Sequence, residues 1–180
     1  MIKYLREIGG KEIMYSIGIR VFAQKDKPGK IYYAVIKKHE DGELELINSS
    51  YLNIPIALAV PEQLAFIRTN FLALITQYNI KKAGLRVTET IARKPLVYRM
   101  NIEGVLQELF ANSSIEEYGL INIAKMSKAL SISMPEIKLY IDKKEIFDGF
   151  ERKQWESFKT EERECILTAL TVLFQKEEEN

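Results

Sequence analysis

The first part of the chain alternates apolar and polar positions in a way that predicts a β-sheet. Residues 14–24 and 31–38 are rich in β-branched and aromatic side chains, and residues 43–48 alternate polar with apolar. A charged, turn-forming loop separates the first two segments, and an Asp-Gly turn at residues 41–42 separates the last two. The pattern therefore predicts three antiparallel strands joined as a meander.

Helical spacing follows Pro61, where apolar residues begin to recur every three or four positions. The first predicted helix covers 62–78, and the second covers 102–111 with Asn101 as its cap. A third helix is expected to begin at the Ser133–Glu136 capping box, and the last one at Thr160. Two short apolar segments, 83–87 and 118–124, predict further strands. Leu170 and Leu173 fall on the apolar stripe of the last helix, so we expect both in the core.

The predicted order of elements is β-β-β-α-β-α-β-α, which favours an α/β class with helices covering a mixed sheet. The right-handed crossover preference brings the fourth strand back beside the first. The length of 180 residues suits a single domain, with its core at about 14–175. The acidic tail 176–180 is expected to fray.

Composition narrows the class of protein. The chain is 47% hydrophobic and 28% charged, and no apolar run reaches the roughly 20 residues that cross a bilayer. One cysteine, Cys165, and one histidine, His39, form neither an internal disulfide nor a zinc site by themselves. We therefore expect a cytoplasmic protein with no membrane partner and no structural metal.

Charge is unevenly distributed along the chain. Residues 1–100 carry seven more basic than acidic residues, whereas residues 101–180 carry six more acidic than basic residues. One interpretation is a basic surface for an anionic partner such as DNA or RNA. The alternative is that the two halves attract each other within one domain.

Several segments resemble RNase H-like nucleases. Ile17-Gly18-Ile19-Arg20 is similar to the end of their first strand, where the charged residue is an aspartate. The rest of the chain resembles a RuvC-type Holliday-junction resolvase in order and spacing. It offers a strand ending near Arg86 or Glu89, a helix start at Arg99–Gly104, a lysine-bearing segment at 125–130, and an acidic pair, Glu161 and Glu164, opening the last helix. The resemblance implies an RNase H-like fold.

The same resemblance implies phosphodiester hydrolysis by two metal ions held by carboxylates. Carried onto this sequence, the first carboxylate position falls on Arg20 and the second on Arg86 or Glu89. A guanidinium group cannot ligate Mg²⁺, which prefers anionic oxygens. The sequence therefore predicts a nuclease-like fold with a degenerate metal site. Glu161 and Glu164 have a second explanation, because carboxylates in a first helical turn are favoured by the helix dipole.

Seven basic residues are candidates for contact with nucleic-acid phosphates: Arg20, Lys81, Lys82, Arg86, Arg93, Lys94 and Arg99. Each of them has an ordinary structural alternative. Arg20 would then be a strand residue whose aliphatic stem packs on an apolar neighbour, and the stretch 81–99 would be a solvated loop.

Three functions remain open at this point. The first is a non-catalytic role in nucleic-acid binding or assembly, with no cofactor. The second is a divergent nuclease that uses Mg²⁺ or Mn²⁺ with Glu89, Glu161 and Glu164, and with Glu103 as a further ligand. The third is a module that binds another protein or a second copy of itself.

Overall fold

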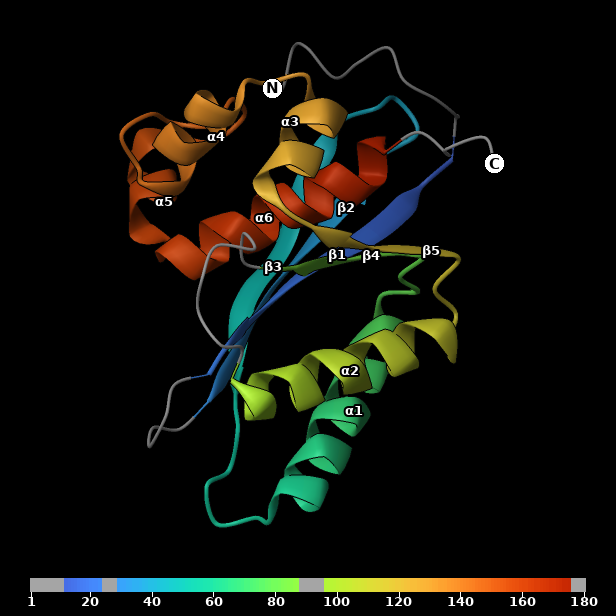
Figure 1. Ribbon diagram of the computed structural model, residues 1–180. Coiled ribbons are helices and arrows are strands. Elements are labelled where there is room, and N and C mark those ends of the chain that lie inside the picture. Colours follow the sequence, from blue (N-terminus) through green and yellow to red (C-terminus); the bar gives the residue numbers. More distant parts are fainter. Residues whose placement is uncertain (1–11, 24–28, 88–95, 176–180) are drawn as a thin grey trace.

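The computed structural model describes residues 12–23, 29–87 and 96–175, which form a mixed sheet with helices on both faces (Figure 1). The strands are β1 (Met14–Phe22), β2 (Lys30–Lys38), β3 (Leu44–Asn53), β4 (Lys82–Arg86) and β5 (Glu117–Ile121). The helices are α1 (Val60–Gln77), α2 (Val97–Ala111), α3 (Ile123–Leu130), α4 (Met134–Ile141), α5 (Arg152–Ser157) and α6 (Thr160–Phe174).

The sheet confirms the predicted meander and crossover. Its strand order is β3-β2-β1-β4-β5, with β1, β2 and β3 antiparallel and β4 parallel to both β1 and β5. Helices α1 and α2 cover one face, and α3 to α6 lie on the other (Figure 1). The C-terminal ends of β1 and β4 therefore lie side by side.

Three predicted boundaries were wrong. Strand β3 runs to Asn53 instead of ending at residue 48. Helix α2 begins at Val97, so Asn101 lies inside it and does not cap it. Tertiary contact overrides the local signal here, because Tyr98 donates a hydrogen bond to Gln63 of α1 and so supports an earlier start.

The third wrong boundary lies in the segment 118–124, which is not one strand. Strand β5 ends at Ile121, and the Asn122 side chain accepts a hydrogen bond from the backbone N–H of Lys125 at 2.9 Å. Asn122 thereby caps α3, an element expected only from the family resemblance at 125–130. The Ser133 capping box of α4 is confirmed.

Helix α6 is buried on all sides. Every residue from Arg163 to Phe174 is buried, because α6 packs between the sheet and helices α3 and α4 (Figure 1). Leu170 and Leu173 lie in the core as predicted. The sequence predicted that one apolar stripe of this helix is buried. In the structure its polar side is buried as well, including Thr168 and Thr171.

A row of glycines lets α6 approach the sheet. Gly18, Gly84 and Gly119 are aligned across β1, β4 and β5. A Cβ atom on Gly18 would lie 2.0 Å from the backbone oxygen of Cys165 in α6. A Cβ on Gly84 would lie 2.6 Å from Cγ2 of Thr168. The backbone of α6 thus rests almost directly on β1, where no side chain larger than glycine fits.

In the part of the chain that the structure describes, no helix is long and apolar enough to cross a membrane. The tail 176–180, which is expected to fray, lies outside the described residues.

Candidate functional site: an Arg–Glu–Arg triad

Two arginines and one glutamate meet where the C-terminal ends of β1 and β4 lie under α6. Arg20 and Arg86 are register partners on these parallel strands. Glu164 contacts both of them. Its Oε1 lies 3.2 Å from Nε of Arg86, and its Oε2 forms an ion pair with Nη1 of Arg20. We call these three residues the Arg–Glu–Arg triad.

The row of Gly18, Gly84 and Gly119 determines where the triad forms. Each arginine lies two residues after a glycine of that row, Gly18 or Gly84, and therefore on the same face of its strand. Thr168 stands over Gly84, and Glu164 lies one helical turn before Thr168. The close approach that the glycines allow therefore brings Glu164 directly over the two guanidinium groups.

The triad is buried. The side chains of Arg86 and Glu164 are 4% and 6% exposed, and that of Arg20 is 18% exposed. Arg86 also donates to the backbone oxygens of Val87 and Ile121. Among the described residues, Nε of Arg20 is buried and has no hydrogen-bond acceptor. Two guanidinium groups thus share one carboxylate.

Burial dominates the acidity of Glu164. Removal from water raises the pKa of the Glu164 carboxyl, while the charges of Arg20 and Arg86 act in the opposite direction. Glu161 adds a smaller upward effect on the same pKa, so its carboxylate lies near the triad. A carboxyl group in this position is held by cations and not by a shell of water.

Among the described carboxylates of the nuclease hypothesis, Glu103 lies apart from Glu161 and Glu164. Glu103 forms an ion pair with Arg99 at 2.6 Å on α2, across the sheet from Glu161 and Glu164. Glu89 lies outside the described residues. Within residues 12–23, 29–87 and 96–175, no group of three or more His, Cys, Asp or Glu residues could hold a metal ion. The side chains at the triad do not fit a two-metal centre, because two of the three are cations.

The predicted basic residues are spread over the molecule. Lys82 begins β4 and Arg86 ends it, so about 13 Å of strand separates them. Lys81 and Lys82 form ion pairs with Glu116 and Glu117 at 2.8 Å. Arg93 and Lys94 lie outside the described residues. Among the described basic candidates, the structure therefore brings Arg20 and Arg86 together and leaves Lys81, Lys82 and Arg99 apart from them.

Ion pairs join the basic and acidic halves of the chain. Arg20, Arg68, Lys81, Lys82 and Arg86 all pair with carboxylates from beyond residue 100. This pattern favours the alternative in which the uneven charge is neutralised within the domain. It leaves less of the basic half available for a partner.

Two tyrosines extend the row of the triad, and sequence reasoning missed them. Tyr32 is the register partner of Arg20, and Tyr51 is the register partner of Tyr32. The row across the sheet thus reads Arg86, Arg20, Tyr32, Tyr51. Alternation along β2 could have assigned Tyr32 to a face, but the pairing with Arg20 depends on register. The sequence does not determine the register between two strands when the loop that connects them is long.

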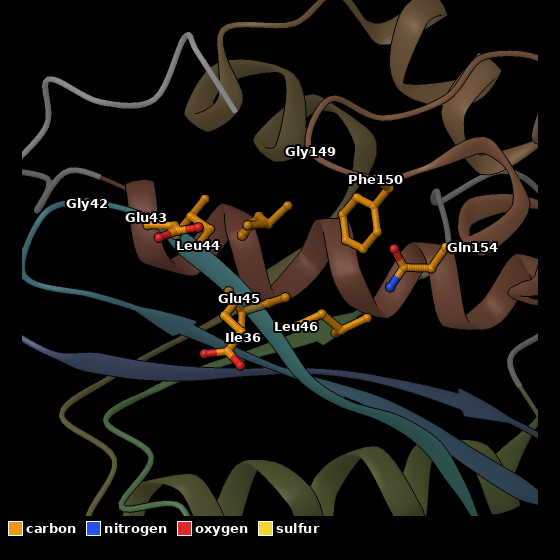
Figure 2. A pocket seen from close by; sticks show the side chains of 10 residues that line it. Ile36, Gly42, Glu43, Leu44, Glu45, Leu46, Gly149, Phe150 and Gln154 are labelled. Carbon is orange, nitrogen blue, oxygen red and sulfur yellow. The ribbon is translucent and has the colours of Figure 1, made fainter. Parts of the chain in front are cut away.

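A cavity of about 300 Å³ lies elsewhere, between the β2–β3 hairpin and the segment before α5 (Figure 2). Its lining is about equally polar and apolar, and Glu43, Glu45 and Gln154 contribute polar side chains. Leu170 of α6 contributes to it, six residues beyond Glu164. The cavity therefore does not include the triad.

Comparison with solved structures places the fold. Thermus thermophilus RuvC superposes with a TM-score of 0.65 at 12% identity, covering 89% of this chain and 94% of that one. The chain has a RuvC-like form of the RNase H-like fold. The same enzyme in complex with a Holliday junction substrate gives a TM-score of 0.64 at 13% identity, with 89% and 94% coverage. A Fowlpox virus resolvase bound to Holliday junction DNA matches at a TM-score of 0.46 and 12% identity, covering 88% and 93%.

No protein-family model matches this sequence, and no curated protein matches it. The likeness to RuvC therefore rests on the arrangement of strands and helices. It confirms the fold class that the sequence predicted.

Proposed function

We propose that this RuvC-like protein binds nucleic acid without cleaving it. The observation that carries the proposal is the Arg–Glu–Arg triad. In the carry-over from the resolvase resemblance, the first carboxylate position falls on Arg20, the second on Arg86 or Glu89, and the last pair on Glu161 and Glu164. Arg20 and Arg86 both contact Glu164. A guanidinium group neutralises a carboxylate and forms directed hydrogen bonds with it, as a metal ion would neutralise it. In the triad, ion pairs between side chains would thus do the neutralising that metal ions do in the family's site.

A nucleic-acid partner is supported by the fold. Thermus thermophilus RuvC, which shares this architecture, has been solved in complex with a Holliday junction substrate. Binding to this chain would be through phosphates, since no base-reading motif is present in the sequence, and it would weaken steeply with salt.

A protein partner is the second candidate, and the edge of the sheet favours it. Strand β5 ends the sheet order, and Tyr118 and Leu120 on it are 52% and 41% exposed. An open edge with exposed apolar side chains is a common place for another chain to add a strand.

The test combines binding and cleavage. We expect retention of labelled single-stranded, duplex or branched nucleic acid at low salt and no cleavage after addition of Mg²⁺ or Mn²⁺. Glu161→Gln and Glu164→Gln are the controls for cleavage. Metal-dependent cleavage that either substitution abolishes would overturn the proposal. Failure to bind any nucleic acid would shift the assignment to a protein-binding module.

A second experiment tests the triad as a former metal site. The double variant Arg20→Asp/Arg86→Glu places three carboxylates around one point, since both arginines already contact Glu164. We expect this variant to be less stable than the wild type in EDTA, because like charges repel, and to regain stability with Mn²⁺.

The readout is the thermal midpoint in EDTA and in Mn²⁺. The wild type should show no specific shift, and adding Glu164→Gln to the double variant should remove most of the response. A response that is the same with and without Glu164 would show that the three positions do not form one site.

A further inference from the structure

A group of aromatic and basic side chains adjoins the triad on the same face of the sheet. Tyr32 and Tyr51 have ring centroids 5.4 Å apart. The Nζ atoms of Lys30 and Lys159 lie 4.6 and 4.8 Å from the centroid of the Tyr51 ring. We call Lys30, Tyr32, Tyr51 and Lys159 the tyrosine–lysine patch.

The patch is assembled from three separate parts of the chain. Tyr51 comes from β3, Lys30 and Tyr32 come from β2, and Lys159 immediately precedes α6. Lys159 also lies 5.8 Å from the Tyr32 ring. Since Tyr32 is the register partner of Arg20, the patch begins where the triad ends.

Exposure differs within the patch in a way that suits a ligand. Tyr32 is 5% exposed and serves as the floor, whereas Tyr51 is 37% exposed. Lys159 is exposed and Lys30 is partly exposed. Tyr51 and Lys159 are therefore open to solvent, and Lys30 is partly so.

Among the described residues, Lys30 and Lys159 form no ion pair with a carboxylate, unlike Lys81 and Lys82. For Lys30 and Lys159 the recorded side-chain contacts are with tyrosine rings, whereas Lys81 and Lys82 have glutamate partners. Glu162, three residues after Lys159, accepts hydrogen bonds from Ser49 Oγ at 3.3 Å and from the Lys159 backbone N–H at 2.9 Å. The carboxylate is thus engaged by other donors, and the two ammonium groups are left to attract an anion.

We propose that the tyrosine–lysine patch binds one nucleotide of a single-stranded nucleic acid, with a base against Tyr51 and phosphates on Lys30 and Lys159. This inference rests on the proposed function and names the surface that carries it. Aromatic rings beside cations are the elements that proteins use to bind single strands without sequence preference. A duplex keeps its bases stacked on each other, so it cannot offer one to Tyr51.

The test is fluorescence anisotropy of a labelled single strand of mixed sequence, in DNA and RNA forms, with the matching duplex measured in parallel. Tyr51→Ala is expected to weaken single-strand binding about 5- to 100-fold, the range for loss of one stacked base. Tyr51→Phe keeps the ring and is expected to bind as the wild type does. Tyr118→Ala is the matched control, because Tyr118 is also an exposed tyrosine on an edge strand.

The lysines are tested through salt dependence. Each phosphate contact on a single strand contributes about 0.7 to the slope of log K against log salt. Lys30→Gln/Lys159→Gln removes two such contacts and is therefore expected to flatten that slope by about 1.4. Lys125→Gln/Lys138→Gln removes the same charge from exposed positions on α3 and α4 and is expected to leave the slope nearly unchanged.

The outcomes separate this inference from the proposed function. Wild-type binding that neither Tyr51→Ala nor the Lys30/Lys159 pair weakens would overturn the patch and leave nucleic-acid binding in place. No binding by the wild type would overturn both. Patch variants that change self-association in sedimentation, with unchanged nucleic-acid binding, would make the patch a protein interface and overturn the inference.

Discussion

Gly18→Ala is expected to destabilise the protein by about 3 kcal/mol or more, at the upper end of the cost of overpacking a core. The new Cβ would lie 2.0 Å from the backbone oxygen of Cys165 and 2.6 Å from the backbone nitrogen of Ala169. Both obstacles are backbone atoms of a helix buried on all sides. The only way to relieve the contact is to move α6 off the sheet, and this movement would open the core.

Two other glycines provide controls for this prediction. At Gly84 the added Cβ would meet the side-chain ends of Thr168 and Val172, so Gly84→Ala is expected to cost less than Gly18→Ala. Gly104 is exposed on α2 with nothing within 4 Å, so Gly104→Ala is expected to stabilise by about 1 kcal/mol through helix propensity. Urea denaturation of the three variants gives the order. A loss below about 1 kcal/mol for Gly18→Ala would show that α6 is not seated as described.

The close packing of α6 against the sheet is also needed to form the triad. Glu164 reaches Arg20 and Arg86 because the helix lies against Gly18 and Gly84. A helix displaced outward would carry Glu164 with it and leave two buried guanidinium groups without their shared carboxylate. The glycine row is therefore a requirement of the site as well as of the core.

Much of the fold follows from local pattern. Richness in β-forming residues predicted β1 and β2, and alternation predicted β3. Helical spacing predicted α1 and α6, and the right-handed crossover placed β4 beside β1. Boundaries failed where two local signals competed. Asn101 and Asn122 are both good caps by residue type, but only Asn122 serves as one, and contact of Tyr98 with Gln63 decides the start of α2.

The site was predictable in part. Arg20, Arg86 and Glu164 were named because the resemblance to RNase H-like nucleases and RuvC-type resolvases carries the family's carboxylate positions onto them, with Glu89 as the alternative to Arg86 and Glu161 beside Glu164. Their assembly into one triad required the glycine row, whose importance appears only when strand register aligns Gly18 with Gly84. The patch around Tyr51 depends on the pairing of three strands and on the path of the chain before α6. No local pattern specifies these features.

Arg86→Met is expected to destabilise the protein by about 3–5 kcal/mol, the usual cost of removing one partner of a buried ion pair. Arg86 is 4% exposed, and its loss leaves the Val87 and Ile121 oxygens without their guanidinium donor. Arg152→Met is the control. Arg152 pairs with Glu156 at 3.0 Å on the surface, with side chains 73% and 43% exposed, so its loss should cost less than about 1 kcal/mol.

The cost of Arg86→Met should grow with pH. Arg86 lowers the pKa of Glu164 against the upward effect of burial, so removing it raises that pKa further. A carboxyl whose folded pKa exceeds its unfolded value contributes full stability below the unfolded value and loses it as pH rises through the folded value. The difference in unfolding free energy between wild type and variant is therefore expected to be larger at about pH 8 than at about pH 5.

Glu164→Gln in the Arg86→Met background identifies the cause. The second substitution removes the carboxylate that Arg86→Met leaves short of cations, so the double variant is expected to recover about 1–3 kcal/mol. It should also lose the added pH dependence, because the titrating group is gone. Arg20 remains, and its 18% exposed side chain can turn toward water. A pH dependence that persists without Glu164 would place its origin outside the triad. Retained single-strand binding by the double variant would then show that the triad supports the fold while contact with nucleic acid lies elsewhere.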